Sequence, residues 1–134
     1  MAPHTRKALG EDLTALGVSA GDILMVHASF REVGWTVGGA VEVVRALLDA
    51  LGDEGTLVMP AETPQYADPD DWDDPRVQPD WHEAIREHLP GFDPATSPST
   101  MGAIAEAFRT YPGTQRSYHP LVSVCARGPA AETL

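Results

Sequence analysis

A strand-to-helix unit in residues 22–52 constrains the fold of this chain most strongly. It begins with a short apolar run, residues 23–26, which predicts a buried strand. A loop containing the glycine pair Gly38 and Gly39 follows, and then an amphipathic helix that ends at Gly52. Backbone N–H groups at such a turn, together with the helix N-terminus, favour a phosphate-bearing ligand at the carboxyl end of the strand.

Residues 55–60, GTLVMP, predict a second strand that is stopped by Pro60. Strand, helix and strand in this order form a βαβ unit, so we expect parallel strands joined by a right-handed crossover. Residues 121–126 predict a third strand. The predicted fold class is therefore α/β, with a mainly parallel sheet of βαβ units flanked by helices in one domain of residues 1–134.

Two further helices are predicted on either side of this unit. Thr5 can cap a first helix whose Leu9, Leu13 and Leu16 share one face, with Gly17 after its end. Ser99 or Thr100 can cap a later helix that carries Ile104, Ala107 and Phe108. The chain ends at Leu134, one turn into another predicted helix, and we expect the domain to be incomplete there because domains rarely end in this way.

Residues 61–99 are predicted to form a long acidic, proline-rich loop region within the domain, with one short helix around residues 81–89. A connection of this length inside a domain is usually functional or mobile. Five aspartates, at positions 68, 70, 71, 73 and 74, fall within seven residues. They form either a solvated acidic surface or an electrostatic funnel for a polycationic ligand.

Charge and composition exclude several classes of function. The net charge of −11 argues against partners such as nucleic acid and against anionic membrane surfaces. No apolar run approaches the roughly 20 residues that span a bilayer, and the N-terminus has no apolar signal core. We therefore expect a cytoplasmic protein with no membrane partner. Cys125 is the only cysteine, so no internal disulfide can form. A homodimer is a separate possibility that the sequence leaves open.

Four sequence blocks resemble, in order, those of the aminoglycoside 3-N-acetyltransferases. The blocks are MVHASF with its later VGG, then GTLVMP, then FDPATSPSTMG, and then RSYHPLVSVCARG. The resemblance implies an antibiotic N-acetyltransferase-like fold, distinct from the common GNAT fold. It also implies a transferase that moves acetyl from acetyl-CoA to the 3-amino group of an aminoglycoside, which confers antibiotic resistance. We keep two alternatives open: an acetyltransferase of this family that acts on another amine, and a non-catalytic CoA-binding fragment.

The resemblance also assigns residues to the two substrates. This chain has Ala28 where the family most often has a second serine, and Phe30 where it has leucine, so a hydroxyl contact at position 28 is lost. The residues expected to bind CoA are Ser29, Phe30, Val37, Gly38, Gly39, Ser97, Ser99, Met101 and Gly102. The residues expected to bind the polycationic aminoglycoside are Glu62, Tyr66 and Asp68.

No residue of this chain is assigned as the catalytic base. His119 is expected to shape the site wall, with proton transfer as the alternative, and His27 is expected to be structural. In the resembled family, the histidine and the acidic residue that activate the amine lie in a C-terminal block. That block has no equivalent before Leu134, so the 134 residues alone are expected to be inactive. We expect no metal site, because His82 and His88 are six positions apart and do not share a helix face.

Overall fold

The predicted βαβ unit is present. In the computed structural model, which describes residues 2–134, β1 (Ile23–Met25) and β2 (Thr56–Pro60) pair in parallel. They are joined through α2 (Phe30–Val33), which was not predicted, and α3 (Ala40–Leu51). α3 ends at Gly52, as predicted, and the whole of β2 is buried.

The sheet as a whole is mixed, and the prediction of a mainly parallel sheet was wrong. Its order is β1-β2-β4-β3, and β4 (Val124–Arg127) is antiparallel both to β2 and to β3 (Gln115–Arg116). The reason is a hairpin. The chain leaves α5 (Ala103–Arg109) and enters the sheet at β3, in the same direction as β2, and then turns back as β4 between the two.

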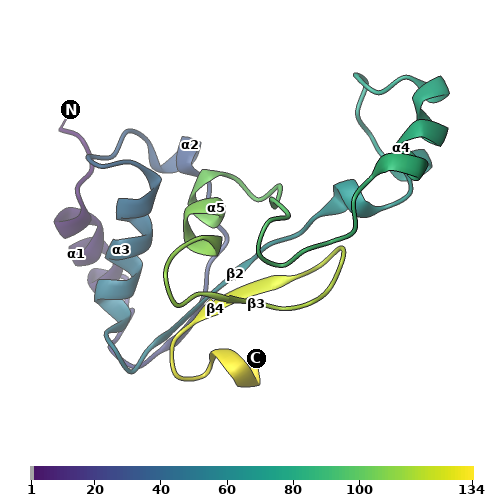
Figure 1. The fold of residues 1–134 in the computed structure, drawn as a ribbon. Coiled ribbons are helices and arrows are strands. Elements are labelled where there is room, and N and C mark those ends of the chain that lie inside the picture. Colours follow the sequence, from purple (N-terminus) through teal and green to yellow (C-terminus); the bar gives the residue numbers. More distant parts are fainter. Residues whose placement is uncertain (1) are drawn as a thin grey trace.

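Helices cover one face of this sheet (Figure 1). α1 (Arg6–Ala15) packs on α3, and α3 packs on α5. Leu9 and Leu13 of α1 contact the core, whereas Leu16, the C-cap residue, is 82% exposed; all three line the same groove. The core is centred on α3, α5 and β2, and its largest fully buried side chains are Phe108, Leu51, Leu57, Met59 and Ile104.

The opposite face of the sheet is covered only in part. The short turn η4 (Ala131–Thr133) places Ala131 against Val58 and Ala126. On β1, Ile23 and Met25 point to this face and are 59% and 56% exposed. β1 is therefore half-exposed, and the prediction of a buried strand was wrong because η4 covers this face only over β2 and β4.

Residues 67–92, called the arm from here on, project away from the body of the molecule (Figure 1). Residues 93–97, which follow the arm, are called its returning end. The segment follows the turn η1 (Pro64–Tyr66) and contains η2 (Pro69–Asp71), η3 (Pro79–Trp81) and α4 (His82–His88), which confirms the predicted short helix. Each of the three turns starts with proline, whose fixed φ suits the first helical position. Within residues 2–134, no helix has the length and apolar character needed to cross a membrane.

Candidate functional site

Two segments that lie far apart in the sequence line one hollow of about 490 Å³. One is residues 28–31, at the end of β1 and the start of α2, and the other is residues 100–103, at the start of α5. α2, α3 and α5 begin on the same side of the molecule (Figure 1). The structure thus brings together four of the residues expected to bind the cosubstrate: Ser29, Phe30, Met101 and Gly102.

Ser29 begins α2 and forms part of this hollow. Its Oγ accepts a hydrogen bond from the N–H of Glu32 at 3.4 Å, so the side chain caps the helix. Phe30 is half-buried and packs against the hydrophobic core. The hydroxyl of Ser29 remains exposed, whereas the ring of Phe30 anchors the loop beneath it.

The glycine pair lies at the start of α3 and does not line this hollow. Gly38 and Gly39 have φ values of +85° and +83°, a backbone conformation that residues with a side chain rarely adopt. A Cβ on Gly38 would lie 2.5 Å from Cγ of Glu42, whereas one on Gly39 would meet no atom within 4 Å. Val37 is 47% exposed, and its N–H donates to the carbonyl of His4 at 2.9 Å.

Ser97 is buried, and its hydroxyl is committed to contacts within the chain. Its Oγ accepts from the N–H of Asp93 at 2.9 Å and shares a hydrogen bond of 2.7 Å with the hydroxyl of Tyr66. Ser97 therefore holds the returning end of the arm against Tyr66. Ser97 is not among the residues that line the hollow.

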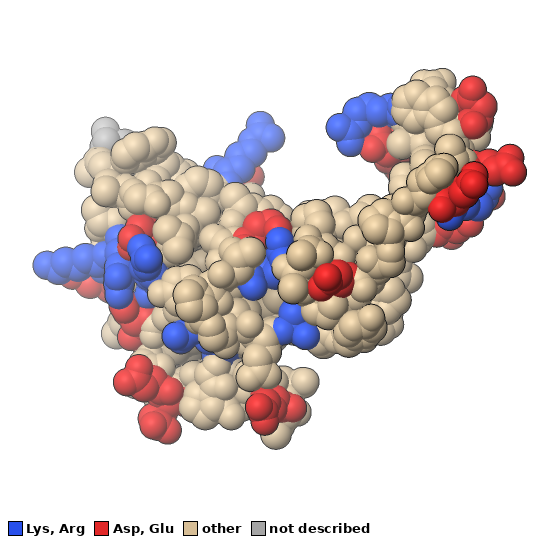
Figure 2. All heavy atoms as spheres, viewed as in Figure 1, with Lys and Arg blue, Asp and Glu red and all other residues tan. Residues whose placement is uncertain are grey.

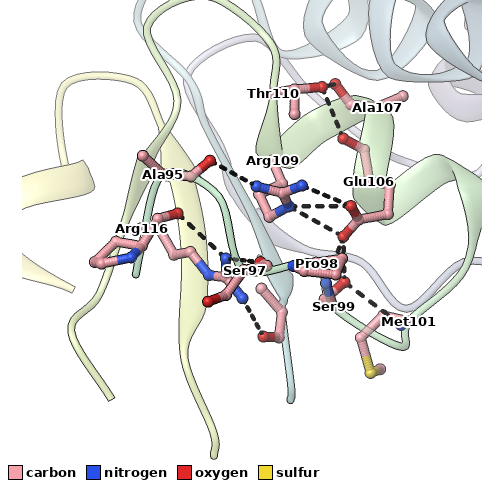
Figure 3. A network of polar contacts seen from close by, with 12 residues as sticks. Ala95, Ser97, Pro98, Ser99, Met101, Glu106, Ala107, Arg109, Thr110 and Arg116 are labelled. Carbon is pink, nitrogen blue, oxygen red and sulfur yellow. Dashed lines mark hydrogen bonds and ion pairs between the residues drawn. The ribbon is translucent and has the colours of Figure 1, made fainter. Parts of the chain in front are cut away.

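Ser99 bonds to a carboxylate in α5. Its N–H and its hydroxyl both donate to Oε1 of Glu106, each at 2.7 Å, and Nη2 of Arg109 donates to Oε2 at 2.7 Å (Figure 3). Burial acts to raise the pKa of Glu106, but the hydrogen bonds from Arg109 and Ser99 outweigh it and the pKa is lowered. The predicted cap of α5 at Ser99 or Thr100 was wrong, because Gly102 is the N-cap, with φ of +98°.

Arg116 is the centre of a network that the sequence analysis missed. Its guanidinium bonds to the end of β2, to the returning end of the arm and to the β3–β4 hairpin, and burial lowers its pKa. A lone arginine in a two-residue strand gives no periodic signal. Its partners are Ser123 Oγ (Nε, 3.0 Å), the carbonyls of Pro94 (Nη1, 3.2 Å), Ser97 (Nη1) and Ala61 (Nη2, 3.2 Å), and the ring of Phe92 (4.9 Å).

The three residues expected to bind the aminoglycoside do not converge. Glu62 is exposed, and its carbonyl accepts from the N–H of Thr100 at 3.0 Å. Tyr66 stacks edge-on against Phe92, with ring centroids 5.9 Å apart. Asp68 lies in the arm and receives two bonds from Arg86, of 3.0 and 2.9 Å, which lower the pKa of Asp68 to about 2.

His119 lies exposed in the turn between β3 and β4. Its Nδ1 accepts from the N–H groups of Leu121 at 3.1 Å and Val122 at 3.0 Å. In a neutral imidazole this leaves the proton on Nε2, so neither nitrogen is free to accept a proton. This geometry favours the structural role over proton transfer.

His27 and Cys125 lie in different settings. His27 is exposed beside an apolar groove of about 440 Å³ between α1, α3 and the loop after β1. Cys125 is buried in β4, and burial raises its pKa to about 11, so the thiol stays protonated. Among residues 2–134, no group of three or more His, Cys, Asp or Glu side chains is arranged to hold a metal ion.

Comparison with known proteins identifies related sequences. The sequence model of the aminoglycoside 3-N-acetyltransferase family matches residues 25–134. The chain is 43% identical over 128 residues to the SPbeta prophage-derived aminoglycoside N(3')-acetyltransferase-like protein YokD of Bacillus subtilis, covering 94% of this chain and 47% of that protein. It is 42% identical to aminoglycoside N(3)-acetyltransferase VIII of Streptomyces fradiae, covering 98% of this chain and 46% of that protein. The chain spans about half the length of the curated relatives it matches.

Solved structures give the same result for the fold. The crystal structure of YokD from Bacillus subtilis superposes with a TM-score of 0.93 at 41% identity, covering 98% of this chain and 53% of that one. AAC-IIIb in binary complex with CoASH matches with a TM-score of 0.81 at 39% identity, covering 98% and 48%. AAC-VIa bound to sisomicin also matches with a TM-score of 0.81, at 35% identity and the same coverage.

Proposed function

The chain belongs to the aminoglycoside 3-N-acetyltransferase family, and we propose from this premise that the protein transfers acetyl from acetyl-CoA to the 3-amino group of an aminoglycoside. One observation carries the proposal: the segments 28–31 and 100–103, from two of the family-like blocks, meet around a single hollow. Relatives of similar fold have been solved with the two kinds of substrate, AAC-IIIb with CoASH and AAC-VIa with sisomicin.

The hollow offers main-chain and hydroxyl groups to the cosubstrate. In α5 the first N–H that bonds within the helix is that of Glu106, so the N–H groups of residues 103–105 have no acceptor inside it. Of these three residues Ala103 lines the hollow, whereas Ile104 and Ala105 are buried, and Ser29, Thr100 and Gly102 lie on the same surface. We retain residues 37–39 as part of the cosubstrate site, so Gly38→Asp should weaken CoA binding at least tenfold.

The arm supplies the negative charge that a polycationic acceptor needs (Figure 2). Asp68 and Asp70 pair with Arg86, and Asp74 pairs with Arg76. Asp71 and Asp73 have no cationic partner among the described residues, and they line a hollow of about 310 Å³ beside Trp72. Two free carboxylates beside an aromatic ring form a surface that attracts ammonium groups.

The reaction that we propose is direct transfer. The unprotonated amine attacks the thioester carbonyl, the new C–N bond forms, the C–S bond breaks, and the thiolate of CoA leaves. Proton removal is not assigned to His119, because its Nδ1 accepts two main-chain hydrogen bonds. The single cysteine agrees with a reducing compartment, and we place the reaction in the cytoplasm.

The test has two measurements. Calorimetry with CoA checks the cosubstrate site, and release of free CoA thiol with kanamycin or gentamicin as acceptor checks the transfer. Binding and turnover together support the proposal. Binding without turnover on any amine favours a non-catalytic CoA-binding protein, and turnover only with other amines favours an acetyltransferase of different specificity. Absence of CoA binding would overturn all three.

A further inference from the structure

Two of the nine lysines and arginines lack a partner within residues 2–134. They are Lys7 and Arg31, which make no ion pair and no side-chain hydrogen bond with any described residue. The others are engaged: Arg6, Arg45, Arg76, Arg86 and Arg109 pair with carboxylates, and Arg116 and Arg127 donate to main-chain carbonyls. In a chain of net charge −11, these two cations are therefore the ones among the described residues that remain free to bind an external anion.

The two free cations lie in different places. Lys7 lies on α1, beside the Arg6–Asp49 ion pair. Arg31 lies on α2 and lines the hollow shared with Thr100 and Gly102. The acidic neighbour of Arg31, Glu32, lines the apolar groove on the α1 side instead. The hollow thus carries one free positive charge, and no carboxylate is among its lining residues.

We propose that Arg31 is the counter-charge for a phosphate group of coenzyme A, an inference that rests on the proposed function and names a specificity residue for it. CoA carries a pyrophosphate and a 3′-phosphate, and the overall negative charge of this chain repels both. A guanidinium presents two parallel N–H donors that match two phosphate oxygens. The hydroxyl of Ser29, which only accepts a hydrogen bond within the described residues, lies on the same surface and can donate to a remaining oxygen.

The test compares Arg31→Gln, Arg31→Lys and Lys7→Gln by titrating CoA into the protein. Arg31→Gln and Lys7→Gln remove the same charge from exposed helix positions, so the second variant controls for the general field of the protein. We expect Arg31→Gln to weaken CoA binding about tenfold and Arg31→Lys to weaken it less, because an ammonium keeps the charge but loses the fork. Lys7→Gln should leave the affinity unchanged.

Two further measurements identify the interaction. The difference between wild type and Arg31→Gln should shrink in high salt, because exposed charges are screened. Dephospho-CoA, which lacks the 3′-phosphate, separates the two sources: the difference persists if Arg31 contacts the pyrophosphate and disappears if it contacts the 3′-phosphate.

The negative outcomes are distinct. If wild type binds CoA and Arg31→Gln binds it equally well, the role of Arg31 is overturned and the proposed function stands. Equal losses in Arg31→Gln and Lys7→Gln, or a loss that salt does not change, would also overturn it. If wild type fails to bind CoA, the proposed function fails and this inference fails with it. Circular dichroism of each variant verifies that the fold is retained.

Discussion

Nε of Arg116 donates to Oγ of Ser123 at 3.0 Å, and that hydroxyl donates in turn to the carbonyl of Ala61 at 2.8 Å. This relay joins the β3–β4 hairpin to the end of β2. Since Nη1 of Arg116 also donates to the carbonyl of Pro94, the same side chain fixes the returning end of the arm. The arm and the segment leading into α5 therefore have one common point of attachment.

Replacing Arg116 should destabilise the protein more than replacing Ser123. Arg116→Met leaves several acceptors without a donor, and we expect the free energy of unfolding to fall by about 2–4 kcal/mol. Ser123→Ala removes one neutral donor, and we expect a loss of about 1 kcal/mol. Urea denaturation of both variants measures this. Equal losses would show that the guanidinium contributes no more than the hydroxyl.

Gly38 and Gly39 form a matched pair for a second test. Alanine at either position must adopt a positive φ, which costs about 1–2 kcal/mol. Gly38→Ala also forces the side chain of Glu42 away from its 2.7 Å bond with Arg45, so it should cost more than Gly39→Ala. Thermal melts check this order, and the added change Glu42→Ala should remove the difference. Equal melting temperatures for the two alanine variants would contradict the contact.

The free aspartates of the arm should govern capture of a polycationic acceptor. Asp71→Asn with Asp73→Asn should raise KM for an aminoglycoside, most clearly at low salt, with kcat little changed. The control is Asp53→Asn with Glu54→Gln, which removes the same charge from the turn before β2. An equal fall in kcat at saturating acceptor would instead place these aspartates in the chemistry.

The Asp68–Arg86 pair predicts a specific acid titration. Hydrogen bonds from Arg86, and then from the N–H of Asp70, lower the pKa of Asp68 from 3.8 to about 2. Since the folded pKa lies below the unfolded one, the contribution of the pair is complete above pH 3.8 and is lost as the pH falls through about 2. Carboxyl NMR should give a midpoint of about 2, and Arg86→Gln should return it toward 3.8. A wild-type midpoint near 3.8 would mean that the pair does not form in solution.

The sequence predicted best those elements that follow from local patterns. The apolar stripe and the terminal glycine located α3, and the proline located the end of β2. The strand predicted at residues 121–126 is present as β4, but β3 was missed because a two-residue strand has no periodicity. The direction of β4 was also missed, because it depends on which strand β4 meets. The exposure of Ile23 was missed for a related reason: the sequence does not show that the face of the sheet on which Ile23 lies is left uncovered at β1.

In the candidate site, too, the residues that belong to local sequence motifs were predicted and those that depend on long-range contacts were not. The resemblance located Ser29 and Met101, and the fold brings their segments together at one hollow. The sequence analysis assigned no role to Arg31 or Arg116, because these two residues are distinguished only by the groups that surround them in the fold. One has no partner among the described residues, and the other binds carbonyls from distant segments. Long-range contacts of this kind leave no periodic trace in the chain.

Three of the four polar groups that Arg116 binds are main-chain carbonyls, those of Ala61, Pro94 and Ser97. A carbonyl is present whatever amino acid occupies the position, so mutations at these sites leave acceptors for the guanidinium in place. Substitutions that change the charges and aromatic groups of the arm therefore leave the carbonyl groups that Arg116 binds in place. The attachment of the arm's returning end to the sheet thus depends on backbone conformation rather than on the identity of the side chains there.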